Sequence, residues 1–249
     1  LVFNKKFGIN YLYQPFFTQQ LGVFTSLPIS KKLINNFIDA IPTHYKYIDI
    51  NLNEINDISE RKEVTALTNY HLDLNLDYAL IKVNYSKSLK RKLNKAEKNE
   101  LLINQHLTPE VFVEFYLKNV AYKVDNFKEK HKHVLHRIIY KALSFQLGAI
   151  IGVNNKNNEL IAANFILLHP TRIINLLPCS SAEGNELNAM PFLIDYILQR
   201  NANNRKIFDF EGSMIDGVAQ FYKSFGAEES KYYKLKMNSL PIFLRVFKK

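Results

Sequence analysis

The segment from Lys206 to Ala227 constrains the fold more than any other part of this sequence. Its apolar run, Ile207 to Phe210, is typical of a short buried strand, which stops where polar and turn-forming residues begin at Glu211. Asp216 is the expected N-cap of a helix, and Gly226 is suited to the left-handed conformation that ends one. The pattern predicts a strand, a polar loop and a short helix. A strand that ends in acidic residues is a candidate functional site.

The rest of the chain alternates between helix and strand patterns. Three strands in the second half are separated by short turns, which predicts an antiparallel meander followed by a long helix. The aromatic and glutamine-rich segment over 11–25 favours short strands or a strand and a loop. The other expected elements are helices over 31–41, 77–99, 107–118, 128–147 and 186–200, and strands over 45–52, 63–74, 149–153, 160–168, 171–177 and 231–237.

A chain of 249 residues with 47% hydrophobic residues is long enough for a sizeable core in one large domain or two of ordinary size. No stretch has the long uncharged apolar run of a membrane span or the layout of a signal peptide, so stable membrane insertion is not expected. The single cysteine, Cys179, has no partner for an internal disulfide and fits a reducing compartment. These features together predict a cytoplasmic location.

Basic residues outnumber acidic ones by 33 to 23, so the surface is expected to attract polyanions such as nucleic acid or a nucleotide-linked substrate. The charge is concentrated in the helix over 77–99, where Lys90, Arg91 and Lys95 are candidate phosphate contacts. The alternative is a solvated connecting helix in a generally basic protein that has no polyanionic ligand.

Asp209 and Glu211 are candidate general bases at the end of the strand. The two-residue alternation of a strand would place both carboxylates on one face, where each affects the pKa of the other. Tyr222 is a candidate proton donor, and Ser213 a candidate hydrogen-bonding partner for a substrate. The structural alternative is that the acids hold loop amides, Tyr222 packs as an aromatic residue, and Gly212 only makes the turn.

No metal site is expected. His133 and His136 are spaced three apart on a helix, yet no cysteine lies nearby and the neighbouring lysines would repel a cation. Cys179 is interpreted as a buried structural thiol, because no histidine has an evident reason to lie beside it as a base.

The order of meander, helix, strand, helix and strand resembles the second half of an acyl-CoA N-acyltransferase (GNAT) fold. The short helix of that superfamily often carries Tyr-x-x-x-Gly followed by an apolar residue, which Tyr222, Gly226 and Ala227 match. The segments with a closer resemblance to FemAB-like proteins and their GNAT-domain relatives are FDFEGS, FYKSFGA, QPFFTQQLG and SLKRKLNKAEKN.

This resemblance implies an α/β (α+β) protein with mixed central sheets flanked by helices. It implies tandem GNAT-like domains, with a degenerate one over 1–100 that ends in the basic helix and a second over 101–249. The implied reaction moves an acyl or aminoacyl group from acyl-CoA or aminoacyl-tRNA to a small-molecule or peptidyl amine, with no permanently bound cofactor. The residues expected to line the substrate site are Gln14, Gln19, Lys90, Arg91, Lys95, Ser180, Ser181, Gly212, Ser213 and Phe221.

One departure from the family pattern concerns the donor. Superfamily members that bind CoA usually hold its pyrophosphate on a glycine-rich loop before the long helix. Here that place is taken by Pro178 to Glu186, which has one glycine and two acidic residues. Like charge would oppose a pyrophosphate, so aminoacyl-tRNA or another activated donor is favoured. The alternative to an enzyme is a non-catalytic binding module that holds a nucleotide-linked or polyanionic ligand on the same fold.

Overall fold

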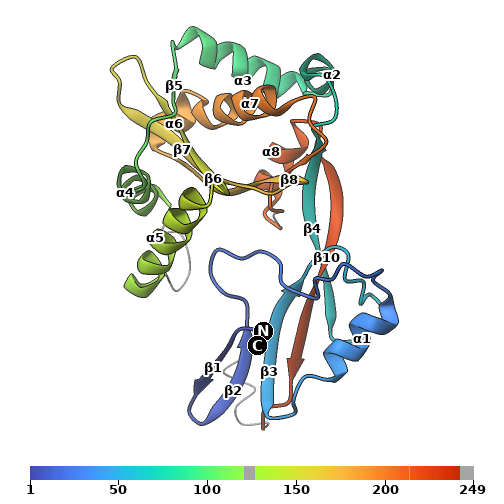
Figure 1. Ribbon diagram of the computed structural model, residues 1–249. Helices are drawn as coiled ribbons and strands as arrows, with labels where there is room; N and C mark the ends of the chain where they lie inside the picture. Colours follow the sequence, from blue (N-terminus) through green and yellow to red (C-terminus); the bar gives the residue numbers. More distant parts are fainter. Residues whose placement is uncertain (121–126, 213, 242–249) are drawn as a thin grey trace. The chain divides into compact units, whose positions relative to one another are not determined.

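The computed structural model describes residues 1–120, 127–212 and 214–241, which form an α+β fold with a mixed sheet of ten strands flanked by helices (Figure 1). The strand order is β1-β2-β3-β10-β4-β9-β8-β7-β6-β5. The strands are β1 (Phe3–Lys6), β2 (Ile9–Tyr13), β3 (Tyr45–Leu52), β4 (Val64–Asp73), β5 (Leu102–Asn104), β6 (Gly148–Asn154), β7 (Leu160–Leu168), β8 (Arg172–Ser180), β9 (Ile207–Asp209) and β10 (Glu228–Asn238). The helices are α1 (Lys31–Asp39), α2 (Tyr78–Val83), α3 (Lys87–Lys98), α4 (Pro109–Asn119), α5 (Glu129–Ser144), α6 (Ala182–Glu186), α7 (Ala189–Asn201) and α8 (Asp216–Lys223).

The chain divides into two compact units, and the first is made from both ends of the sequence. It contains residues 1–69 and 229–249, and the second unit contains residues 70–228. This division differs from a boundary at residue 100, because β10 returns from the end of the chain to pair antiparallel with β3. A tandem pair of GNAT-like domains stays a prediction.

The first unit has a small core between α1 and its strands. Ile34 and Ile38 of α1 are buried with Ile48 and Ile50 of β3 and with Leu235 of β10. The helix begins as the sequence predicts, since the Ser30 side chain accepts a hydrogen bond from the amide of Leu33.

The second unit carries the antiparallel strands β5 to β8, with β9 parallel to β8 and antiparallel to β4. Helix α7 packs against β6, β7 and β8, while α4 and α5 lie on the opposite face of these strands (Figure 1). Helix α3 packs on α7, and the hydroxyls of Tyr78 and Tyr85 both donate to the carboxylate of Asp195 at 2.8 Å. The basic helix is thereby held at a fixed place on the unit.

Three of the expected elements differ from the structure. The helix over 77–99 is two helices, because Ser86 begins α3 as an N-cap and donates its own amide to the carbonyl of Ser224. The expected loop after residue 177 is instead the end of β8, followed by α6. The prediction of Asp216 as the N-cap of α8 is wrong, because Ile215 occupies that position and Asp216 lies in the first turn.

Candidate active site

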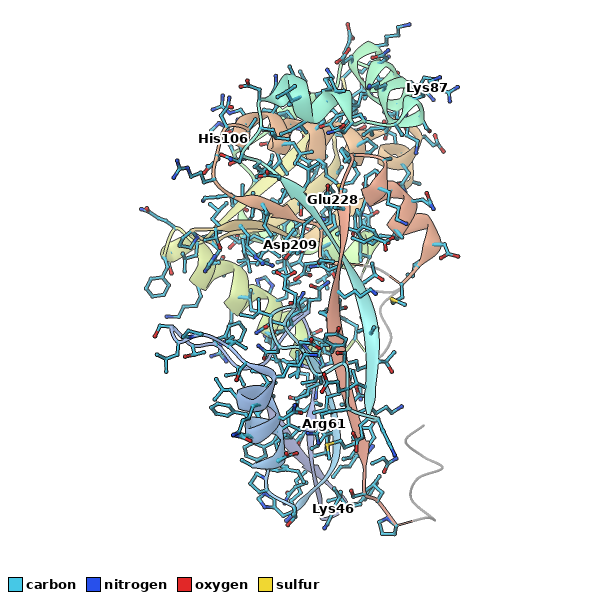
Figure 2. The ribbon with its side chains drawn as sticks, turned by 90° about the vertical axis from the view of Figure 1, so that its right-hand side faces the viewer. Lys46, Arg61, Lys87, His106, Asp209 and Glu228 are labelled. Carbon is cyan, nitrogen blue, oxygen red and sulfur yellow. The ribbon has the colours of Figure 1, made fainter. Side chains whose placement is uncertain are left out.

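Asp209 lies at the end of β9 and is almost completely buried, with 3% of its surface exposed (Figure 2). Its Oδ2 contacts the guanidinium of Arg172 at 2.5 Å and Nε2 of His71 at 3.5 Å. Burial alone would raise the pKa of this carboxyl, but hydrogen bonding and charge from His71, the Glu211 amide and Arg172 hold the pKa below its usual value. Asp209 is therefore an ionised anchor of the site and a weak proton acceptor.

Glu211 has the opposite electrostatic character. Burial first, and then the charge of Asp209, raise the pKa of its carboxyl to about 8. The residue also has a positive φ of 52°, a conformation that is uncommon for non-glycine residues and is often found at functional sites. Since β9 ends at Asp209, the strand alternation that would place both acids on one face does not extend to Glu211. A carboxyl with this pKa can accept a proton near neutral pH.

Tyr222 links the acids to an open cavity. Its ring contacts that of Phe210, with 4.7 Å between ring centroids, and the residue is 7% exposed. Burial and the charges of Glu211 and Asp209 raise the pKa of its hydroxyl to about 12. The hydroxyl therefore stays protonated at neutral pH and is able to donate a proton or a hydrogen bond.

The cavity beside Tyr222 has a volume of about 510 Å³ and lies entirely within the second unit. Its walls come from the end of β8, from α7 and from α8, with Lys92 of α3 contributing a positive charge. Its lining includes Lys92, Asn175, Pro178, Ser180, Phe221 and Tyr222.

The strand wall of this cavity is a sheet edge. Strand β8 pairs with β9 only over 172–174, where β9 ends. Ser181 donates its amide to Ile161 on the β7 side, so the strand alternation turns the backbone nitrogens of Ser180 and Pro178 toward the opposite edge. Because proline has no N–H, this edge offers fewer donors to an extended substrate than an ordinary strand.

The segment that would face a CoA pyrophosphate does not fit that group. The Ser181 side chain already accepts the amide of Gly184, and Glu183 puts an acid in the first turn of α6. A Cβ on Gly184 would lie 2.0 Å from the carbonyl oxygen of Ile161, so this glycine serves close packing. The residues present therefore oppose a pyrophosphate at this helix.

A second cavity, of about 360 Å³, lies between α3 and α8. It shares Lys92 and Phe221 with the first cavity, and Lys223 gives it a second positive charge. Of the three basic residues predicted to bind phosphate, Lys90 donates to the carbonyl of Val83 and Arg91 to that of Lys87. Lys95 donates to the carbonyl of Glu186 at 3.4 Å. Lys92 is thus the basic residue of α3 that reaches both cavities.

The structure brings Ser180, Phe221 and Tyr222 together in the wall of the first cavity. Gln14 and Gln19 belong to the first unit, where Gln14 accepts the amide of Asn51 and Gln19 accepts a hydrogen bond from Gln20. Gln14 thereby ties the loop after β2 to β3, and Gln19 bonds its neighbour within the same loop.

Three other residues that were predicted to line the site, and Cys179, have the following positions in the structure. Ser181 caps α6, and Gly212 directly follows Glu211. Ser213 lies outside the described residues. Cys179 is buried, and its Sγ donates to the carbonyl of Ala163. Burial raises the pKa of its thiol, which keeps the thiol protonated and unreactive.

Two functional candidates were missed by sequence reasoning. Lys92 was one lysine among many in a basic helix, and only its position on the helix separates it from its neighbours. Asn175 carried a clearer signal, because it is a lone amide within the apolar run from Ile173 to Leu177. A polar residue in a buried strand requires a hydrogen-bond partner, and a ligand can supply that partner.

Within residues 1–120, 127–212 and 214–241, no group of three or more His, Cys, Asp or Glu side chains is arranged to hold a metal ion. Across the same ranges, each helix is too short or too polar to cross a membrane.

The structure is similar to a crystal structure of FemX, with a TM-score of 0.65 and 10% identity over 99% of this chain and 86% of that one. It is also similar to the C-terminal domain (DUF2156) of a putative lysylphosphatidylglycerol synthetase from Agrobacterium fabrum, with a TM-score of 0.55 and 11% identity over 87% and 75% of the two chains. For L-PGS from Bacillus licheniformis the TM-score is 0.52, with 12% identity over 87% and 74%. No protein-family model and no curated protein matches this sequence. The chain therefore has the FemAB-like, GNAT-type fold that its sequence resemblance predicted.

Proposed function

We propose that this protein is a transferase that moves an acyl or aminoacyl group from an activated donor to an amine. The observation that carries the proposal is that Glu211, whose pKa is raised to about 8, acts electrostatically on Tyr222, which lines a cavity. An amine acceptor must lose a proton before it attacks, and a base is most effective when its pKa lies near the working pH. The fold shared with FemX supports the same class of reaction.

The chemistry follows from these two groups. The Glu211 carboxylate takes a proton from the ammonium form of the acceptor, and the free amine then attacks the carbonyl carbon of the donor. As the tetrahedral intermediate collapses, the bond from that carbon to the carrier oxygen breaks. The Tyr222 hydroxyl gives its proton to the leaving oxygen, and the phenolate takes up the proton that the attacking nitrogen loses. The products are an amide and a carrier alcohol, and Tyr222 is again protonated. Asp209 acts as a positioning residue, because it holds the Glu211 amide and carries its own charge in ion pairs.

The donor is better described as a phosphorylated carrier other than CoA. The start of α6 and the missing N–H of Pro178 both disfavour a CoA arm along β8. The second cavity instead offers Lys92 and Lys223, beside the cavity that would hold the acyl group. Lysine ammonium groups bind phosphates as point charges without demanding a fixed geometry. An aminoacyl ester of an RNA fits this division, with the ester in one cavity and a phosphate in the other.

The test is a single-turnover transfer assay with acetyl-CoA and with alanyl-tRNA as separate donors, and with a mixture of small and peptidyl amines as acceptors. Amide formation from alanyl-tRNA that falls at least ~10-fold in Glu211→Gln, and not in the exposed control Glu228→Gln, is the expected result. Equal activity with acetyl-CoA would contradict the donor assignment. Binding of a donor without transfer to any amine would favour the non-catalytic binding module.

A further inference from the structure

Asn175 of β8 is a buried amide with one unused donor. The residue is 1% exposed and lines the first cavity. Its Oδ1 accepts a hydrogen bond from Nδ2 of Asn164 at 2.7 Å. Among the described residues, Nδ2 of Asn175 has no hydrogen-bond partner, and neither has Oδ1 of Asn164. A buried donor without a partner destabilises a protein, so such groups are rare in native structures.

Ser180 repeats this arrangement on the same strand. Its hydroxyl is buried without a partner in the described part of the chain, and the residue lines the same cavity. Two unsatisfied polar groups thus lie along one wall. Much of the remaining lining is apolar and comes from Pro178, Met190, Pro191, Ile194, Val218 and Phe221. Among the described residues that line the cavity, none is acidic.

We propose that Asn175 is a specificity-determining residue that recognises an acyl group by donating a hydrogen bond from Nδ2 to its carbonyl oxygen. The Ser180 hydroxyl is a second donor to the same ligand. The identification of the ligand as the acyl end of the donor rests on the proposed function, whereas the recognition of a carbonyl rests on the cavity itself.

The chemistry of the wall selects this ligand class. An unused N–H requires an acceptor oxygen, and the apolar side chains that make up much of the lining favour an acceptor that is bonded to hydrocarbon, with Lys92 as the charged exception. A carbonyl flanked by an aliphatic chain meets both conditions. During transfer the carbonyl oxygen gains negative charge, and a donor already held in place strengthens its hydrogen bond to that oxygen without reorganising. The bond from Asn164 ties the Asn175 amide to β7 and restricts its rotation.

The competing explanation is that the two asparagines only join β7 to β8. Asn175→Asp separates the two roles, because aspartate keeps the shape and the oxygen that accepts from Asn164 but replaces the Nδ2 donor with an oxygen. A structural pair survives this change with its hydrogen bond intact, whereas carbonyl recognition loses its donor. Ile194→Val is the matched control, since it alters the same cavity without changing a polar atom.

The experiment is a titration of protein labelled with ¹⁵N at asparagine, in which N-butylacetamide serves as a small carbonyl probe. We expect the side-chain NH₂ signals of Asn175 to shift on addition of the probe in the wild type and in Ile194→Val. The affinity for the probe should fall at least ~5-fold in Asn175→Asp, as loss of one hydrogen bond implies. Unmoved Asn175 signals, equal affinity in Asn175→Asp, or a preference for butylamine, which lacks a carbonyl, would each overturn the inference.

This experiment is independent of turnover. If the probe binds through Asn175 while no donor reacts, carbonyl recognition stands and the transferase proposal fails. If Asn175→Asp transfers acyl groups at the wild-type rate and binds the probe unchanged, the transferase proposal stands and the assignment of Asn175 fails.

Discussion

The backbone amide of Glu211 donates a hydrogen bond to Oδ1 of Asp209 at 2.9 Å. Asp209 is ionised and anchored by Arg172 and His71, so this bond fixes the turn in which Glu211 adopts its positive φ. The same negative charge helps to raise the pKa of Glu211. One buried carboxylate thereby sets both the position and the proton affinity of the other, and two carboxyl groups with separated pKa values are typical of sites that carry out acid–base chemistry.

The ion pairs of Asp209 predict a large loss of stability in Asp209→Asn. The amide would leave the Arg172 charge without its buried partner, and breaking a buried pair in this way typically lowers the free energy of unfolding by about 3–5 kcal/mol. Urea unfolding monitored by circular dichroism measures the change, with exposed Glu228→Gln as the control. A loss below about 1 kcal/mol would show that the pair contributes no more than a surface salt bridge.

The raised pKa of Glu211 predicts a pH-dependent effect of Glu211→Gln. An unfolded Glu titrates near 4.5 and the folded carboxyl near 8, so between these values the folded state holds a proton that the unfolded state has lost. Wild-type stability therefore decreases as pH rises across this window, and glutamine removes the decrease. We expect the melting temperature of the variant to exceed that of the wild type increasingly from about pH 5 to about pH 8. If the melting temperatures of the variant and the wild type differ by the same amount at every pH, the raised pKa of Glu211 is contradicted.

Much of the fold was predictable because the strands and helices carry clear periodicity. The strand over 45–52 and the short strand before Glu211 appear where apolar alternation or runs predict them. The break between α2 and α3 was not predicted, since it depends on a backbone bond from Ser86 to the distant Ser224. Helical spacing continues through that break, and the local signal of it is Ser86, a residue type that favours N-cap positions.

The position of the site in the chain was easier to predict than the role of each of its residues. Sequence adjacency placed Asp209, Glu211 and Tyr222 in one segment, but the different environments of the two acids depend on Arg172 and His71, which come from other strands. The unused donor of Asn175 likewise depends on a pairing with β7 that no local pattern specifies. Tertiary partners decide the protonation and hydrogen bonding of a side chain, whereas the sequence specifies only its type.

The packing of Gly184 predicts that Gly184→Ala destabilises the protein without a direct effect on phosphate binding. The new Cβ would lie 2.0 Å from the Ile161 carbonyl oxygen, so α6 or β7 must move. Overpacking of this kind typically lowers the free energy of unfolding by about 1–3 kcal/mol. Urea unfolding of the variant measures the free energy of unfolding. An unchanged value would mean that α6 moves to accommodate the new Cβ.

The Tyr222 hydroxyl predicts a loss of turnover without a loss of stability in Tyr222→Phe. Within the described residues the hydroxyl makes no hydrogen bond, so its removal leaves no partner unsatisfied and retains the ring contact with Phe210. Loss of a general acid typically lowers the rate by about 10²–10⁴-fold. Thermal melting and single-turnover transfer from alanyl-tRNA are measured on the same sample. An unchanged rate would remove Tyr222 from the proposed chemistry.

The position of Lys92 between the two cavities predicts a specific change in salt dependence. If Lys92 neutralises one phosphate of an RNA-linked donor, Lys92→Met should reduce the slope of log affinity against log salt concentration by about 0.7–0.9. Lys87→Met is the matched control, because Lys87 is an exposed lysine at the start of the same helix and lines neither cavity (Figure 2).

Filter binding of uncharged tRNA at several salt concentrations measures both slopes. A smaller slope in Lys92→Met alone locates a phosphate at the junction of the cavities. Equal changes in the two variants would instead show that α3 attracts RNA through its general charge, because an unlocalised field weakens by a similar amount whichever lysine is removed. In that case the second cavity would not be the binding site of a donor phosphate.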